Sequence, residues 1–446
     1  MHRIGTLASA LGAAALTACS GSSAPVAPPL PPSDGFGLSY LGTQQIDARL
    51  YELKFNTPDL NETAGVRVLL PADYASSGNR YPVLYLLHGS QNDETAWTSA
   101  GEGDAETLSA GLPLIVVMPW GGSDGDYSDY YNFGAYGNER WESFHTERLL
   151  PWIDAHYRTI ASRGGRAVAG LSMGGGGAMK YAARHPQLFG AAASFSGDVD
   201  SNYPPLLGTP DIPSSGRLPY AVWGLRATDE VRWRGNNPWD LALNLRGMAL
   251  FIRSHTGLPG NGELGDPIEA GAYAQSMDLD QQLTVLNIPH LFNDDGPGGH
   301  EWPHWNADLK ATLPALMQNF RQPVPAPAAT SFTTIENQYT AYGWQVRLDR
   351  PVLEFSTLGN ATTQGFSFTG SGDAVVTTPA LFQPGRSFHV GITHGDASIT
   401  LAIAADGMGR LSIPFTLGPA NPYQEYTVQA ALAGTKVYRV DVSIRP

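Results

Sequence analysis

The stretch RAVAGLSMGGGGAMKYAA, residues 166–183, decides the fold of this chain. Its first four residues form a short run typical of a buried strand, and its last residues are the small and apolar ones of a packed helix. Between them, Gly170-Leu171-Ser172-Met173-Gly174 leaves space only for a sharp turn. Such a turn strains the backbone of its serine, and the flanking glycines let the strand and the helix approach closely. We therefore expect the hydroxyl of Ser172 to project from a strand–turn–helix unit.

The same five-residue pattern occurs a second time, and it is weak evidence by itself in a chain with 51 glycines among 446 residues. Gly121-Gly122-Ser123-Asp124-Gly125 also fits the pattern. The residues that follow it, DYSDYYN, have no helical period and indicate a loop. The surrounding sequence is therefore what distinguishes Ser172 from Ser123.

Short apolar runs alternate with helical patterns from residue 36 to residue 321, which predicts a mostly parallel sheet covered on both faces. This is the α/β class, and the Ser172 turn favours the doubly wound α/β-hydrolase fold within it. The other expected strands lie at 66–70, 82–87, 113–118, 190–195 and 248–253, and the clearest helices at 139–160, 178–185, 267–287 and 305–320.

The C-terminal part has a different pattern. Residues 322–330 form a low-charge linker rich in proline and alanine, and residues 331–446 alternate with period two between turn residues. This predicts an all-β, sandwich-like domain of about seven or eight strands, in which residues 436–444 are the plainest strand. Such a domain could contact a glycan or a polymer, or it could only support the larger domain.

The N-terminus resembles an export signal. Residues 1–18 carry one arginine and an apolar run too short to span a bilayer, and Leu16-Thr17-Ala18-Cys19 resembles a bacterial lipobox. We expect a lipid on Cys19 and a stiff tether at residues 19–35, which would place an exported lipoprotein at the cell surface or on a periplasm-facing membrane. The alternative is an ordinary signal peptide with a chance cysteine.

The charge balance excludes one class of partner. The formal net charge is −14, only 15% of residues are charged, and no basic stripe is present that could neutralise phosphates. We therefore expect no nucleic-acid partner.

A serine hydroxyl needs a histidine as base, and the histidine needs a carboxylate to orient it. In this fold the chain order is serine, then acid, then histidine, which leaves His290, His300 and His304. His300 is favoured because it follows a glycine-rich loop, DDGPGG.

The acid is less clear from the residues alone. Glu269 follows Asp266-Pro267-Ile268, so it could simply be the third residue of a capping box at a helix start. On this basis Glu263, Asp266 and Glu269 remain nearly level.

The expected strand at 82–87 runs into His88-Gly89-Ser90, where this fold supplies an oxyanion donor. We expect the backbone N–H groups of Ser90 and Met173 to form the oxyanion hole. The alternative for His88-Gly89 is an ordinary strand exit.

Taken together, these motifs resemble the esterase D and mycobacterial mycolyltransferase branch of the α/β-hydrolases over about residues 40 to 321. The resemblance is carried, in the family's order, by YLLHG at 85–89 with Trp97, WESF at 141–144, GLSMGG at 170–175 and HEWPHWN at 300–306.

The resemblance indicates which residue is the acid of the triad and which molecule accepts the acyl group. In that family the acidic residue lies early in a helix before the histidine, and its glutamate form is soon followed by glycine; Ile268-Glu269-Ala270-Gly271 matches. The chain departs from mycolyltransferases where those have Asp and Arg for the sugar acceptor, because His88 and Gln91 stand here. The resemblance thus favours hydrolysis over acylation of a sugar.

The sequence therefore predicts a serine carboxylic-ester hydrolase with the triad Ser172, His300 and Glu269, an acyl-enzyme intermediate, and no metal or organic cofactor. The expected substrate is an acyl, aromatic or polymeric ester. One alternative is a cell-envelope acyltransferase that passes the acyl group to a sugar or lipid hydroxyl. Another is a surface lipoprotein that only adheres.

Overall fold

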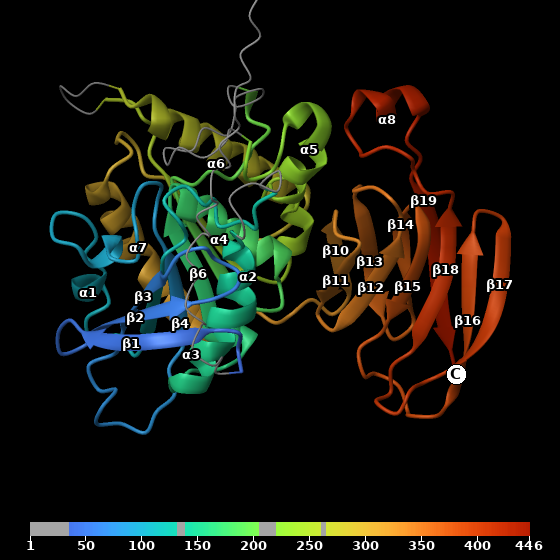
Figure 1. Cartoon of the computed structure of the whole chain (residues 1–446), viewed down its shortest axis with the longest axis horizontal. Coiled ribbons are helices and arrows are strands. Elements are labelled where there is room, and N and C mark those ends of the chain that lie inside the picture. Colours follow the sequence, from blue (N-terminus) through green and yellow to red (C-terminus); the bar gives the residue numbers. More distant parts are fainter. Residues whose placement is uncertain (1–34, 132–138, 205–219, 260–264) are drawn as a thin grey trace, which may run out of the picture.

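The computed structural model describes residues 35–131, 139–204, 220–259 and 265–446 (Figure 1). The expected signal segment, most of the tether, Cys19 and Glu263 lie outside these ranges. The described chain forms a nine-stranded sheet with helices, followed by two further sheets.

The nine-stranded sheet is mixed and mostly parallel, in the order β1-β2-β3-β5-β4-β6-β7-β8-β9. Strands β4 to β9 pair in parallel, whereas β1, β2 and β3 form an antiparallel edge joined to β5. This confirms the predicted α/β class with its mostly parallel sheet. The strands are β1 (Ser39–Gln45), β2 (Leu50–Asn56), β3 (Ala64–Leu69), β4 (Val83–Leu87), β5 (Ile115–Pro119), β6 (Arg166–Leu171), β7 (Ala191–Phe195), β8 (Ala249–Ser254) and β9 (Leu291–Asp294).

The helices cover both faces of this sheet, because alternate side chains of each buried strand belong to two separate cores. One core holds apolar residues of α3, α4 and α6, and the other holds those of α1 and α7. The helices are α1 (Ala105–Leu108), α2 (Trp141–Ser143), a π-helical turn (Phe144–Leu149), α3 (Leu150–His156), α4 (Met173–Arg184), α5 (Arg226–Gly235), α6 (Pro267–Val285) and α7 (Trp302–Arg321). Short 3₁₀ turns lie at Ala96–Thr98, Arg163–Gly165 and Ala242–Leu245.

Two antiparallel sheets make up the C-terminal part, in the orders β10-β13-β14-β19-β16-β17 and β11-β12-β15-β18. They enclose a core that includes Trp344, Phe368 and Val376. The elements are β10 (Thr330–Thr334), β11 (Gln338–Ala341), β12 (Trp344–Asp349), β13 (Ser356–Thr362), β14 (Gly365–Gly370), β15 (Gly372–Thr377), β16 (Ser387–His394), β17 (Ala397–Ala404), β18 (Ser412–Gly418), α8 (Val428–Ala433) and β19 (Tyr438–Arg445).

The predicted all-β class is therefore correct, but the predicted number of strands is wrong. Short strands such as β10 and β11 follow each other so closely that the sequence pattern merges them with their turns.

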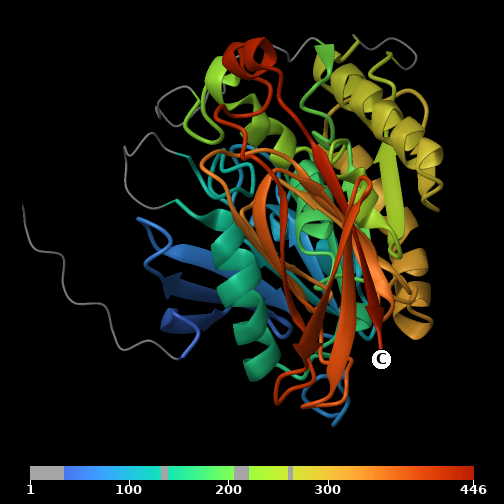
Figure 2. The ribbon, with the colours of Figure 1, turned by 90° about the vertical axis from the view of Figure 1, so that its right-hand side faces the viewer.

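The two parts of the chain lie side by side, and Figure 2 shows the sandwich sheets in front of the larger sheet. The side chain of Asn244 donates to the carbonyl of Thr333 at 2.8 Å and accepts from its N–H at 2.7 Å. Gly235 packs against Ile335 so closely that a Cβ at this glycine would lie 2.4 Å from the isoleucine. Within the described ranges, no helix has the length and apolar character to cross a membrane.

Candidate active site

Ser172 lies in a sharp turn between β6 and α4. Its φ of 52° and ψ of −124° are unusual for a residue with a side chain, and it forms the N-cap of α4. Its N–H donates to the carbonyl of Phe195 at 2.9 Å, which fixes the turn against β7. A Cβ at Gly170 would lie 2.3 Å from the carbonyl oxygen of Gly174, so a larger residue could not occupy this position. The strain is thus stored in a turn that presents the serine hydroxyl.

The second serine of the same pattern has a different setting. The carbonyl of Ser123 accepts a hydrogen bond from the N–H of Gln91 at 2.6 Å, and the described residues that follow it, 124–131, contain turns and no helix. Ser123 is therefore part of a loop, as the sequence predicted.

His300 faces Ser172 from the loop between β9 and α7. Its Nε2 lies 2.8 Å from Oγ of Ser172, within hydrogen-bond distance. Of the other two histidines considered, His290 pairs with Asp280 at 2.8 Å, and His304 lies 3.5 Å from Glu301. The structure thus brings only His300 of these three to the serine.

Glu269 lies in the first turn of α6 and is completely buried. Its Oε2 is 2.7 Å from Nδ1 of His300. Its Oε1 accepts three hydrogen bonds, from the hydroxyl of Ser196 at 2.8 Å, the hydroxyl of Ser254 at 2.9 Å and the N–H of His255 at 2.7 Å. Both oxygens of the buried carboxylate are therefore satisfied, and one of them is directed at the imidazole.

Asp266 is the N-cap of α6 and supports the same histidine. Its side chain accepts from the N–H of Ile268 at 2.9 Å and of Glu269 at 3.2 Å, and its other oxygen accepts from the N–H of His300 at 2.7 Å. Burial opposes the charged form, but these three N–H groups hold the pKa of Asp266 below its ordinary value.

In a capping box, the Asp266 side chain accepts from the N–H of Glu269 and the Glu269 side chain accepts from the N–H of Asp266; only the first of these bonds is present. Glu269 does not reach back to the helix start, since the N–H of Asp266 donates to Gly257 and the glutamate faces the sheet. The Glu269 side chain points towards the sheet because three buried donors there bond to its carboxylate, whereas the exposed start of the helix offers only one N–H group.

One predicted oxyanion donor, Met173, follows the serine in the chain, and the other, Ser90, follows a glycine that lies close to it. Met173 is the first residue of α4, so its N–H has no acceptor within the helix. A Cβ at Gly89 would lie 3.5 Å from Cβ of Ser172, and the exposed Ser90 follows directly. Their role as an oxyanion hole stays a prediction.

His88 is more than a strand exit. It is buried, its Nδ1 lies 2.7 Å from the carbonyl of Gly89, and its Nε2 accepts from the N–H of Gly121 at 2.9 Å. Burial lowers the pKa of His88 to about 4, which keeps the ring neutral. The histidine therefore joins the turn before Ser90 to the loop that contains Ser123.

No sequence pattern pointed to Ser196 and Ser254, the two residues whose hydroxyls donate to Glu269. Ser196 follows the last residue of β7 and Ser254 ends β8, and they meet only because these parallel strands are neighbours. The arrangement as a whole joins a hydroxyl, an imidazole and a buried carboxylate in one chain of hydrogen bonds. Such a chain can activate the serine for acyl transfer.

Comparison with known proteins agrees with this chemistry. Residues 57–316 match the family described as "Putative esterase". The chain is 38% identical to Esterase Rv1288 of Mycobacterium tuberculosis over 274 residues, which are 60% of this chain and 59% of that relative. It is 32% identical to diacylglycerol acyltransferase/mycolyltransferase Ag85B of Mycobacterium leprae over 277 residues, 57% of this chain and 81% of that protein.

Among solved structures, an S-formylglutathione hydrolase from Agrobacterium tumefaciens superposes with a TM-score of 0.50 at 17% sequence identity. The superposition covers 63% of this chain and 99% of that protein. At this identity the similarity concerns the fold, and it agrees with the predicted α/β-hydrolase architecture.

Proposed function

This chain belongs to the putative esterase family, and from that premise we propose that it is a serine carboxylic-ester hydrolase with Ser172, His300 and Glu269 as its triad. The family supports ester hydrolysis in general. The match covers only 59% of the length of Esterase Rv1288. The activity of that relative is therefore not transferred to this chain, and the proposal is argued from the geometry of the site.

In the first half of the proposed reaction, His300 accepts the proton of the Ser172 hydroxyl as the oxygen attacks the ester carbonyl carbon. The N–H groups of Ser90 and Met173 stabilise the oxyanion that forms. The bond to the alcohol then breaks, and the alcohol leaves with the proton from His300. Glu269 orients the imidazole throughout.

In the second half, water attacks the acyl-enzyme. His300 accepts a proton from the water, the acid is released, and the proton returns to Ser172. This chemistry needs no metal or organic cofactor.

The observation that carries this proposal is the continuous hydrogen-bond chain from Oγ of Ser172 through His300 to Glu269, with distances of 2.8 and 2.7 Å. It begins at a serine with φ of 52° and ends at a buried carboxylate. Strain and burial of this kind cost free energy, so their combination supports a functional role.

The test compares two serines of the same five-residue pattern. Hydrolysis of p-nitrophenyl acetate by the full chain should be lost in Ser172→Ala and retained in Ser123→Ala. Mass spectrometry of the wild type with a slowly deacylating ester should find the acyl group on Ser172. Equal turnover by the wild type and Ser172→Ala would contradict the proposal and favour a protein that only adheres.

A second candidate is transfer of the acyl group to a sugar or lipid hydroxyl. It is supported by the 32% identity to Ag85B, which is an acyltransferase by name. Against it, His88 is buried and bonded at both ring nitrogens, so it offers no free group to a sugar. Product analysis with and without trehalose distinguishes the two, because transfer predicts an acylated sugar in addition to free acid.

We also propose that a lipid on Cys19 holds the enzyme on a membrane of the exporting bacterium, as Leu16-Thr17-Ala18-Cys19 suggests. The wild type expressed in a bacterium should enter the detergent phase on phase separation, and Cys19→Ser should stay in the aqueous phase. The sandwich could in addition hold a glycan or polymer. Cosedimentation of the full chain with an insoluble polyester or polysaccharide tests that contact.

A further inference from the structure

A group of metal-ligating side chains lies beside the loop that carries His300. His255 follows the end of β8, Asp295 follows the end of β9, and Asp308 lies in α7. One ligand atom from each of the three residues lies within 4.8 Å of the other two. Three separate elements therefore converge on one point outside the acyl-transfer chain.

Two of these side chains are buried and carry polar atoms that have no hydrogen-bond partner within the described residues. His255 is 6% exposed and Asp308 is 2% exposed. Among the described residues, three of their polar atoms have no hydrogen-bond partner: Nδ1 and Nε2 of His255 and Oδ2 of Asp308. Buried polar groups without partners are rare and costly, so this pair requires an explanation.

The separation of the pair is unlike that of a bonded histidine and aspartate. Nε2 of His255 lies 3.7 Å from Oδ1 of Asp308, which exceeds a hydrogen bond. Elsewhere in the chain, Nε2 of His290 lies 2.8 Å from Oδ1 of Asp280, which is a hydrogen-bond distance. Two ligands of one tetrahedral zinc ion lie about 3.3 to 3.5 Å apart. The distance between Nε2 of His255 and Oδ1 of Asp308 is thus within a few tenths of an ångström of the separation expected for two ligands of one zinc ion.

We propose that His255, Asp295 and Asp308 bind one first-row divalent cation, with Zn²⁺ as the best match. One imidazole nitrogen and two carboxylate oxygens suit such an ion, whereas the imidazole disfavours Ca²⁺ and Mg²⁺. Arg253 binds both oxygens of Asp295, at 2.8 and 3.1 Å, and would orient this ligand as an outer partner.

The position of the site assigns it a structural role. The N–H of His255 donates to Glu269, and Gly298 of the His300 loop packs against the ring of His255, where a Cβ would lie 2.7 Å from Nδ1. A cation here would tie β8, α7 and the start of the His300 loop together. It would hold the base and the acid in place and take no part in acyl transfer.

The test uses the full chain freed of metal by chelator and dialysis. Titration with ZnCl₂ by calorimetry, with elemental analysis after gel filtration, should give one equivalent of zinc per chain. His255→Gln and Asp308→Asn should weaken this binding by more than the roughly 10- to 100-fold that the loss of an outer partner costs. Zinc should also raise the urea midpoint of the wild type and leave that of these variants unchanged.

His290→Gln is the matched control, because it removes a histidine that is already bonded to an aspartate, and it should bind zinc as the wild type does. Asp295 is the exposed member of the three ligands, so Asp295→Asn tests zinc binding even if the two buried variants do not fold. The absence of saturable binding, or equal binding by the wild type and Asp295→Asn, would overturn the proposal. Equally tight binding of Ca²⁺ would overturn it as well.

Discussion

A histidine paired with a buried glutamate lies near each end of helix α4, and only the histidine at the N-terminal end contacts Ser172. At the N-terminal end, Nδ1 of His300 lies 2.7 Å from Glu269. At the C-terminal end, Nε2 of His185 also lies 2.7 Å from a glutamate, Glu142. Distance and burial alone therefore do not distinguish a catalytic pair from a structural one.

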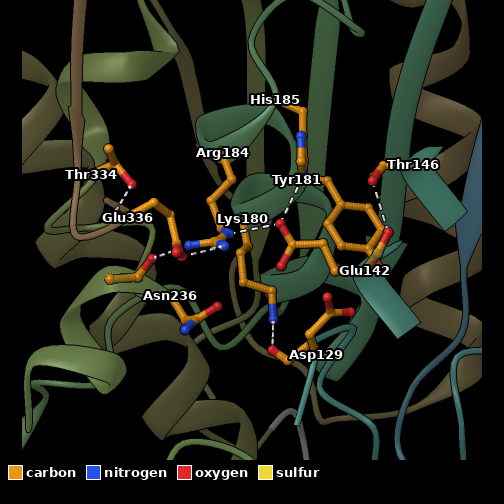
Figure 3. A network of polar contacts seen from close by, with 12 residues as sticks. Asp129, Glu142, Thr146, Lys180, Tyr181, Arg184, His185, Asn236, Thr334 and Glu336 are labelled. Atoms are coloured by element: carbon orange, nitrogen blue, oxygen red, sulfur yellow. Dashed lines mark hydrogen bonds and ion pairs between the residues drawn. The ribbon is translucent and has the colours of Figure 1, made fainter. Parts of the chain in front are cut away.

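The difference lies in what else contacts each pair. Glu142 also binds Nε of Arg184 at 2.7 Å, and this arginine reaches Glu336 of the sandwich at 3.1 Å (Figure 3). Although burial acts in the opposite direction, Arg184 and His185 hold the pKa of Glu142 far below its ordinary value. This end is an ion-pair network that uses the glutamate for charge balance.

At the other end, no arginine or lysine of the described chain bonds to Glu269, whose partners are three neutral donors and His300. The second nitrogen of His300 faces a hydroxyl that can react. The proposed catalytic pair is thus the one whose imidazole has a reactive neighbour, and in the other pair an arginine occupies the carboxylate.

The largest expected effect is the difference in kcat/KM between variants of the two histidines, His300 and His185. His300→Gln should lower kcat/KM for p-nitrophenyl acetate by about 10⁵- to 10⁶-fold, because the serine loses its base. His185→Gln should leave kcat/KM within about threefold, since its pair contacts no reacting atom. Steady-state kinetics measures both. A comparable loss in both variants would show that the two ends are not functionally distinct.

The two glutamates should separate activity from stability. Glu269→Gln should lower kcat by about 10⁴-fold through the loss of imidazole orientation. Glu142→Gln should instead lower the free energy of unfolding by about 3 to 5 kcal/mol, because buried Arg184 loses its counter-charge. Urea unfolding and kinetics of both variants check this. If Glu142→Gln lost activity but no stability, the network would have to be part of the catalytic machinery.

Two further histidines, His88 and His145, bond to no carboxylate within the described residues, and they contribute to the response to acid. Burial lowers the pKa of His88 to about 4 and that of His145 to about 3, whereas the unfolded chain binds a proton near 6.5. Between these values the unfolded state holds more protons, so stability falls as the pH falls from 6.5 towards 4. Each histidine contributes up to about 1.4 kcal/mol per pH unit in that window.

The variant His145→Gln isolates this effect from the buried carboxyls Asp198 and Asp308, whose pKa values burial raises and which act in the opposite direction. Urea unfolding at pH 6.5, 5.5 and 4.5 should show a flatter pH dependence in the variant than in the wild type. Parallel curves would mean that His145 binds its proton over the same pH range in the folded and the unfolded chain, so that burial does not lower its pKa.

The sequence predicted the buried strands and the longer helices because their apolar runs are continuous. It missed β1 and β9, whose residues are mostly exposed and form no apolar run, and it also missed β2, in which Glu52 and Lys54 interrupt the apolar residues. It also missed α5, a helix with little apolar character around Val231 and Trp233. Exposed edges carry too weak a pattern to predict from one sequence.

The site was predictable to the extent that it is local or ordered along the chain. Ser172 followed from its strand–turn–helix context and His300 from its position in a glycine-rich loop. Glu269 needed the family resemblance, because Asp266 and Glu263 satisfied the same local pattern. The hydroxyls of Ser196 and Ser254 and the network at His185 depend on contacts between distant segments, which spacing does not encode.

The smallest expected effect concerns the link between the two parts of the chain. Glu336 is 43% exposed, and Arg184 keeps Glu142 and the carbonyl of Gly235 at 2.8 Å without it. Glu336→Gln should therefore cost at most about 1 kcal/mol of unfolding free energy, as solvent screens this ion pair, and kcat/KM should not change. Asp441→Asn, in the exposed pair with Arg439, is the control with no measurable cost. If Glu336→Gln lowered kcat/KM tenfold or more, the sandwich would act on Ser172 through α4, and the two ends of the helix would form one functional unit.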